Sequence, residues 1–284
     1  MKKLIQRLLM FIVAVPLVVV LVLFLPQRHH LAVNTVIIIL CALGALEFAT
    51  MLNKRGMTIS RLETIILGAL GPAALTITVS FEVNFQILPI ALALGGSWLL
   101  VSRVFSRDGK FEDSLTHIAA GFSVMMYPGM FMTWIIKMAA LPHADRIIFI
   151  FLLGVIANDS TAWAVGMLFG KGNQGIIPAS PNKSVAGFIG GFAASILVGI
   201  GAVYLLPDVF SPKRVPPLPA GIILGLLSGI AASLGDLAES VMKRSSDIKD
   251  SGSIIPGRGG VLDSIDSIAL TAPVFYGLYG LLFG

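Results

Sequence analysis

The chain has 284 residues, of which 56% are hydrophobic and 12% are charged, and its formal net charge is +5. Soluble domains carry about 25% charged residues, so this composition excludes a soluble globular protein, a disordered chain and a coiled coil. The single cysteine, Cys41, excludes a disulfide framework and a cysteine-based metal site, and the four scattered histidines argue against a histidine-built zinc site. Any metal chemistry must therefore use oxygen ligands.

The first apolar run extends over residues 8–26 and follows Lys2, Lys3 and Arg7. We expect a membrane span rather than a secretory signal peptide, because the run is long, contains Pro16 and lacks a small-residue cleavage site. Further runs of about 20 apolar residues predict spans near residues 31–52, 62–80, 85–102, 117–138, 147–169, 184–206, 218–240 and 265–283. The predicted fold is an all-α polytopic membrane protein with about nine transmembrane helices.

Most of the 20 Lys and Arg residues fall in the N-terminus and in alternate loops between these spans. By the positive-inside rule the N-terminus is then cytoplasmic and, with nine spans, the C-terminus is outside. The loops 170–183 and 241–264 would face the cytoplasm. Because the polar motifs gather there, we expect residues 1–140 to form a transmembrane scaffold of five spans and residues 141–284 to form the catalytic region of four.

Near the centre of the expected span 147–169 lie Asn158, Asp159, Ser160 and Thr161. A carboxylate at this depth costs roughly 2.5–3.5 kcal/mol on insertion scales, so it normally faces a cavity, a partner or an ion. A hydrogen-bonded structural cluster between helices is the alternative. We favour a functional role for Asp159.

A glycine-rich segment follows directly and includes Lys171, Ser180, Lys183 and Ser184. Glycine lets main-chain N–H groups converge on an anion, and lysine adds a point charge that suits phosphate. The segment therefore favours phosphate binding, although an ordinary cytoplasmic turn with two lysines would show the same pattern.

At the end of the span 218–240, Asp236, Glu239 and Lys243 recur at i, i+3 and i+7. This spacing places two carboxylates and an ammonium group on one helix face at the cytoplasmic interface. Lys243 and Arg244 could instead be interfacial anchors, which is the commoner role of such pairs. The adjacent acids favour a role in a site.

The next segment contains Lys249, Arg258, Asp263 and Asp266. The two aspartates are three residues apart at the start of a helix, so they can project together toward Mg²⁺, which prefers one or two carboxylates plus substrate phosphates. Helix capping is the alternative for Asp263 and leaves Asp266 unexplained. Six of the 15 acidic residues lie between 236 and 266, which indicates a metal-assisted site for a phosphorylated substrate.

Three motif blocks follow one another along the chain, and each has a specific spacing of residues. They are Asp159-Ser160-x-Ala162 with Gly170-Lys171; Ser180-Pro181-x-Lys183-Ser184-x-x-Gly187; and Ser240-x-x-Lys243-Arg244 with Lys249-Asp250-x-Gly252, Pro256, Gly259-Gly260 and Asp263-x-x-Asp266. The pattern resembles the signature of phosphatidate cytidylyltransferases, also called CDP-diacylglycerol synthases. The hydropathy pattern resembles that of the family over the whole chain, whereas the motifs resemble those of the family over residues 155–275 only.

The chain departs from the family's usual pattern at three positions. Arg258 stands where His is usual, Ser264 where Arg is usual, and Ala186 where Glu or Gln is common. Arg258 keeps a positive charge for phosphate but could not shuttle protons, because Arg does not deprotonate in proteins. Reduced activity or an altered substrate preference therefore stays open.

The resemblance implies an integral-membrane enzyme of phospholipid biosynthesis. In that reaction the phosphate of phosphatidic acid attacks the α-phosphorus of CTP, giving CDP-diacylglycerol and pyrophosphate. It also implies Mg²⁺, with a second, monovalent cation such as K⁺ as a further option, and a homodimer. The expected partners are CTP, phosphatidic acid and membrane lipid, without nucleic acid, at a site that faces the cytoplasm from the inner (plasma) membrane.

The candidate site residues follow from the motifs and the resemblance together. The expected metal ligands are Asp159, Asp236, Asp263 and Asp266. The expected catalytic residues are Asp236, Lys243, Asp263 and Asp266. The expected contacts to substrate phosphates are Lys171, Ser180, Lys183, Ser184, Arg244, Lys249 and Arg258.

An ion-coupled secondary transporter that uses the intramembrane Asp159 is the main alternative. We find no internal repeat of the kind that such transporters carry. Another membrane phosphotransferase would need different acidic motifs, and a purely structural scaffold would leave the acidic residues unexplained.

Overall fold

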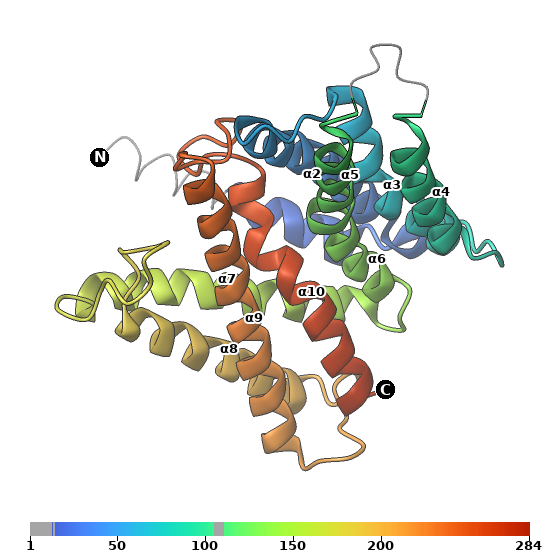
Figure 1. Cartoon of the computed structure of the whole chain (residues 1–284). Helices are drawn as coiled ribbons and strands as arrows, with labels where there is room; N and C mark the ends of the chain where they lie inside the picture. Colours follow the sequence, from blue (N-terminus) through green and yellow to red (C-terminus); the bar gives the residue numbers. More distant parts are fainter. Residues whose placement is uncertain (1–12, 14, 105–110) are drawn as a thin grey trace. The chain divides into compact units, whose positions relative to one another are not determined.

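The computed structural model describes residues 13, 15–104 and 111–284, and within these residues all the regular secondary structure is helical (Figure 1). The prediction of an all-α chain is therefore confirmed. The helices are Val15–Phe24, α2 (Gln27–Lys54), α3 (Arg61–Ser80), α4 (Ile87–Val101), α5 (Ser114–Val124), the π-helix η1 (Met125–Gly129), the 3₁₀ helix η2 (Met130–Met132), α6 (Thr133–Ala139), α7 (Ala144–Phe169), α8 (Val185–Leu205), α9 (Pro217–Ser245) and α10 (Leu262–Leu282).

Seven helical segments of the described chain are long and apolar enough to cross a membrane, and the chain is an integral membrane protein. Two shorter apolar helices, Val15–Phe24 and α4, occupy the remaining two positions at which a span was expected. Nine spans and the orientation of the two termini stay predictions. Lys2, Lys3 and Arg7, on which the orientation of the N-terminus depends, lie outside the described residues.

The chain divides into two compact units. The first comprises residues 1–140 and 245–265, and the second comprises residues 141–244 and 266–284. Residues 245–265, which contain much of the last motif block, belong with the first unit. The assignment of residues 1–140 as a scaffold and of residues 141–284 as the catalytic region stays a prediction.

In the first unit, the expected span 117–138 is a broken helix that runs from α5 through η1 and η2 into α6. Pro128 lies inside η1. Proline has no N–H to donate and its ring clashes with the preceding turn, which accounts for the local change from α-helix to π-helix. A Cβ on Gly129 would lie 2.9 Å from the carbonyl oxygen of Gly68, so this break lies directly against α3.

In the second unit, α8 and α9 are in backbone contact (Figure 1). A Cβ on Gly225 would lie 2.2 Å from the carbonyl oxygen of Ser195, and a Cβ on Gly199 would lie 2.2 Å from that of Gly221. Small residues on the facing surfaces are what permits helices to approach this closely in a membrane, where packing and polar contacts drive association.

Asn158 joins three helices of the second unit. Its amide donates to Ser195 Oγ of α8 at 3.1 Å and to the Gly229 carbonyl of α9 at 3.3 Å, and its Oδ1 accepts a bond from Ser233 at 3.4 Å. The side chain is buried. This part of the polar cluster in α7 is therefore structural, as the alternative reading of the sequence proposed, whereas Asp159 beside it is only half-buried.

Candidate functional site

In the second unit, the glycine-rich segment before α8 meets the acidic end of α9. Lys183 Nζ lies 2.6 Å from Asp236 Oδ2, and Ser240 Oγ donates to Asp236 Oδ1 at 3.5 Å. The Lys183 and Asp236 side chains are 23% and 37% exposed, so both are accessible from outside the protein core. Two motifs that are separate in the sequence thus contribute to one ion pair.

One turn further along α9, Lys243 Nζ lies 2.5 Å from Glu239 Oε2. The Glu239 side chain is fully buried and that of Lys243 is 12% exposed. The shared helix face that the spacing predicts is therefore present. A buried carboxylate needs a compensating charge, and Lys243 supplies it here.

Asp266 of α10 is buried and lies within electrostatic range of Asp236, Glu239 and Asp159. The close approach of α9 and α10 requires a glycine at position 235, because a Cβ there would lie 2.5 Å from the Asp266 carbonyl oxygen. The Oδ1 atom of Asp266 accepts a bond from the Ser267 N–H at 2.6 Å. Gly235 is thus the reason that acids on two helices can gather.

We call Asp159, Asp236, Glu239 and Asp266, with Lys183 and Lys243, the acidic cluster. It holds four carboxylates and two ammonium groups, and its donor atoms for a cation are all oxygens. Across residues 13, 15–104 and 111–284, no group of three carboxylate, imidazole or thiol side chains is placed to hold a metal ion. A cation here would take at most two protein ligands, which fits Mg²⁺ completed by substrate phosphates.

The fourth expected metal ligand, Asp263, lies in the first unit, at the start of α10. Its Oδ2 atom accepts bonds from the Ser251 N–H at 2.8 Å, the Gly260 N–H at 2.7 Å and the Ser251 hydroxyl at 2.8 Å. Asp263 therefore organises the loop before α10, since its three donors belong to Ser251 and Gly260 and none is in the helix itself. The four expected metal ligands fall in two units, and their roles as ligands stay predictions.

Glu47 of α2 is the site-related residue that the sequence reasoning missed. Its Oε1 accepts a bond from the Val261 N–H at 3.0 Å, and its Oε2 accepts bonds from the Leu262 N–H at 2.8 Å and the Ser251 hydroxyl at 3.0 Å. The residue is buried. A signal existed, because Glu47 is an acid inside the apolar run 31–52, and the cost argument applied to Asp159 holds for it equally.

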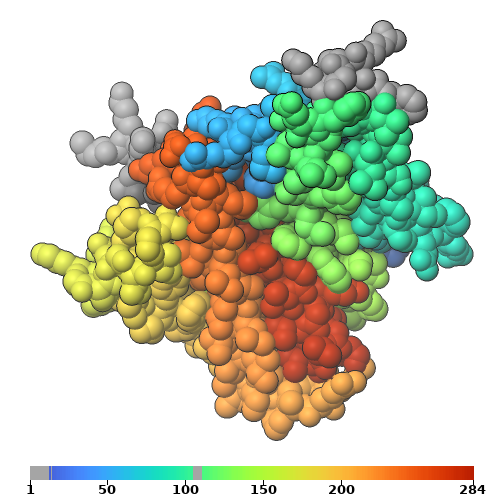
Figure 2. Space-filling view, viewed as in Figure 1, coloured from blue at the N-terminus to red at the C-terminus, as the bar shows by residue number. Residues whose placement is uncertain are grey.

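The remaining candidates for phosphate contact lie mainly at the surface. Lys171 and Arg244 of the second unit and Lys249 and Arg258 of the first unit are exposed. The segment between α7 and α8 that carries Lys171 is yellow in Figure 2 and lies at the surface of the molecule. These positions are accessible to an anion, and phosphate contact stays a prediction for each.

The two serines of the glycine-rich segment differ in their surroundings. Ser180 is half-buried. Ser184 is buried, and its Oγ accepts a bond from the Gly187 N–H at 3.1 Å, so it is the N-cap of α8. Capping is a sufficient reason for a serine at position 184, without any contact to phosphate.

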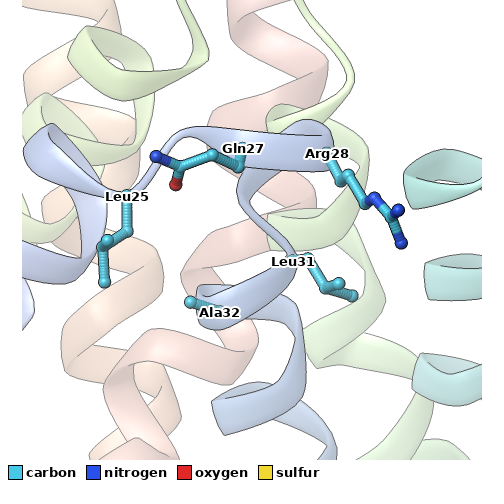
Figure 3. A pocket seen from close by; sticks show the side chains of 5 residues that line it. All are labelled: Leu25, Gln27, Arg28, Leu31 and Ala32. Atoms are coloured by element: carbon cyan, nitrogen blue, oxygen red, sulfur yellow. The ribbon is translucent and has the colours of Figure 1, made fainter.

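In the first unit, an apolar pocket lies at the start of α2. It is lined by Leu25, Gln27, Arg28, Leu31 and Ala32 (Figure 3). None of its lining residues is a candidate from the sequence, and we assign the pocket no role in the site.

Comparison with known proteins relates the chain to one family. Residues 5–282 match the sequence pattern of the "Cytidylyltransferase family". The chain is 44% identical over 121 residues to a phosphatidate cytidylyltransferase of Synechocystis, a match that covers 42% of this chain and 38% of the relative. It is 32% identical over 211 residues to a phosphatidate cytidylyltransferase of Haemophilus influenzae, a match that covers 70% of each chain. It is 33% identical over 176 residues to a phosphatidate cytidylyltransferase of Bacillus subtilis, a match that covers 60% of this chain and 62% of the relative. The match thus spans less than two thirds of the Synechocystis and Bacillus proteins.

Proposed function

This chain belongs to the cytidylyltransferase family, and on that premise we propose that it makes CDP-diacylglycerol and pyrophosphate from CTP and phosphatidic acid. The family relationship that the motifs implied is confirmed. The observation that carries the proposal is the acidic cluster, in which the Lys183 to Asp236 ion pair joins the glycine-rich segment to the end of α9. Three named relatives are phosphatidate cytidylyltransferases.

Little general-base catalysis is needed for this reaction. The second pKa of a phosphate monoester is near 6, so the lipid phosphate is already an anionic nucleophile at neutral pH. The difficulty is that two polyanions must approach each other in line. The two positive side chains of the acidic cluster, Lys183 and Lys243, would reduce that repulsion and hold the phosphates.

We propose that two of the three aspartates of the acidic cluster, Asp159, Asp236 and Asp266, hold Mg²⁺ together with the substrate phosphates. When bound, Mg²⁺ would neutralise phosphate charge and align the α-phosphoryl group for displacement. Glu239 is paired with Lys243 and serves to hold that lysine in place. The role of Asp263, in the first unit, as a metal ligand stays a separate prediction.

The same proposal includes a location and an assembly. The acidic cluster would face the cytoplasm at the inner (plasma) membrane, where CTP arrives from water and phosphatidic acid arrives from the bilayer. The distribution of Lys and Arg supports this orientation. We further propose a homodimer, following the resemblance.

The direct test uses the purified full-length chain in mixed micelles with phosphatidic acid, CTP and a magnesium series. CDP-diacylglycerol should form in proportion to enzyme and should require both substrates and Mg²⁺. If a folded preparation forms none across the series, the proposal is wrong. Solute uptake by proteoliposomes without consumption of CTP would instead support the transporter alternative.

A further inference from the structure

We propose that Glu47 is a positioning residue for Asp263, acting from α2 on the loop that precedes α10. This inference rests on the proposed function, because Asp263 matters for turnover only if the chain is a cytidylyltransferase. It assigns a role to the part of the chain that the motifs left out, since the recognisable blocks begin at Asp159. All the contacts involved lie within the first unit.

The first support is where the Glu47 carboxylate lies. It accepts the main-chain N–H groups of Val261 and Leu262 at 3.0 and 2.8 Å, immediately before and at the first residue of α10. The first N–H groups of a helix have no partner within the helix, and they favour negative charge. Glu47 therefore caps α10 from another helix and fixes the start of the turn that carries Asp263.

The second support is that Glu47 and Asp263 share one hydroxyl group. Ser251 Oγ lies 3.0 Å from Glu47 Oε2 and 2.8 Å from Asp263 Oδ2, and it accepts the Asp263 N–H at 3.3 Å. A serine hydroxyl has one proton, so it can donate to only one carboxylate at a time. Whatever moves the Glu47 carboxylate therefore changes the hydrogen bonding of Asp263.

The third support is a space around Glu47 that only glycine leaves open. A Cβ on Gly252 would lie 2.3 Å from Glu47 Oε1, and a Cβ on Gly260 would lie 2.3 Å from Oε2 and 2.0 Å from Ser251 Oγ. The loop thus closes over the carboxylate with two glycines from the last motif block. These two glycines are explained by the position of Glu47.

The fourth support is the number of donors. Two main-chain N–H groups donate to the Glu47 carboxylate and two donate to Asp263 Oδ2, and the two carboxylates share the one proton of the Ser251 hydroxyl. An amide in place of the Glu47 carboxylate would turn one acceptor oxygen into an NH₂ that faces a donor.

The experiment compares the full-length wild type with Glu47→Gln, Ser251→Ala and the double variant, and uses Glu63→Gln as the matched control. Glu63 is also an acid of the first unit with a largely buried side chain, and it is bonded to Trp98 and His117, away from the loop. For each protein the kcat, the KM for CTP and the half-saturating Mg²⁺ concentration are measured, and amide hydrogen exchange is followed over residues 251–263.

Removing a group that orients a ligand typically costs 10–100-fold in metal affinity or activity. We therefore expect Glu47→Gln to lower kcat or raise the half-saturating Mg²⁺ concentration by about 10-fold, with the KM for CTP changed by less than about twofold. Hydrogen exchange over 251–263 should quicken. Because both residues act through one hydroxyl, the double variant should be much less impaired than the product of the single effects. Glu63→Gln should leave all these values unchanged.

Wild-type kinetics and Mg²⁺ dependence in Glu47→Gln, or multiplicative effects in the double variant, would overturn the inference. An inactive wild type would instead refute the proposed function. The anchoring of the loop by Glu47 would then be decided by hydrogen exchange alone: faster exchange over 251–263 in Glu47→Gln but not in Glu63→Gln supports it, and unchanged exchange refutes it.

Discussion

Charge is scarce in this chain, and two carboxylates of α9 have cationic partners that explain them. Glu239 is fully buried and paired with Lys243, and Asp236 is paired with Lys183. Removing one member of such a pair leaves the other as an uncompensated charge. This destabilises the fold more than replacing both members by apolar residues does. Substitutions in the acidic cluster must therefore be isosteric to report on catalysis rather than on folding.

We predict that Asp236→Asn and Asp266→Asn each lower kcat by about 100-fold or more, because each removes negative charge that would hold a cation against the substrate phosphates. Initial rates of CDP-diacylglycerol formation measure the effect. The control is Asp208→Asn, which removes an exposed aspartate that pairs with Arg146 in the same unit. Full activity in either cluster variant would show that its carboxylate has no part in turnover.

The sequence predicts contacts between side chains that are close in the chain, and it does not predict contacts between side chains that are far apart in the chain. The Glu239 to Lys243 pair follows from helix spacing. Glu47 and Ser251 are 204 residues apart, and nothing local to either position indicates that contact. The cost of an acid inside an apolar run would have marked Glu47 as unusual, but the loop that it binds could come only from the tertiary structure.

The helices follow the apolar runs closely, because a membrane of fixed thickness demands about 20 apolar residues for each span. The expected span 62–80 is α3, Arg61–Ser80, and the expected span 184–206 is α8, Val185–Leu205. The break at Pro128 was not predicted, although proline without an N–H is a sufficient physical reason for it. Hydropathy measures how apolar a segment is and does not register a local change of helix type.

Gly235 allows α9 and α10 to pack closely against each other. In Gly235→Ala the new Cβ would meet the Asp266 main chain of α10 at 2.5 Å, and main chain cannot rotate away as a side chain can. We expect α9 and α10 to separate, with kcat lowered about 10-fold or more and a lower apparent melting temperature.

The control for Gly235→Ala is Gly277→Ala, also in the second unit. A Cβ at Gly277 has no atom within 4 Å to meet, and alanine in a helix is favoured over glycine by about 0.5–1 kcal/mol. That variant should keep its activity and its melting temperature. Equal behaviour of the two variants would mean that the close contact at Gly235 does not matter.

At the scale of the molecule, the chain is an integral membrane protein of the cytidylyltransferase family. The sequence could supply the family, because its motifs lie in long blocks with specific spacing. It could not supply the two compact units, because residues 245–265 join the first unit through contacts with α2 that are remote in sequence. The orientation in the membrane and the homodimer depend on partners outside the chain and stay proposals.

In the proposed reaction, lipid phosphate displaces pyrophosphate from the α-phosphorus of CTP. This displacement is tested most directly by giving the purified chain phosphatidic acid, Mg²⁺ and CTP labelled at either the α- or the γ-phosphorus. The α-label should enter the lipid while the γ-label leaves in pyrophosphate, in equal molar amounts. Transfer of the γ-label to lipid, or no transfer of either label by a folded preparation, would contradict the proposed reaction.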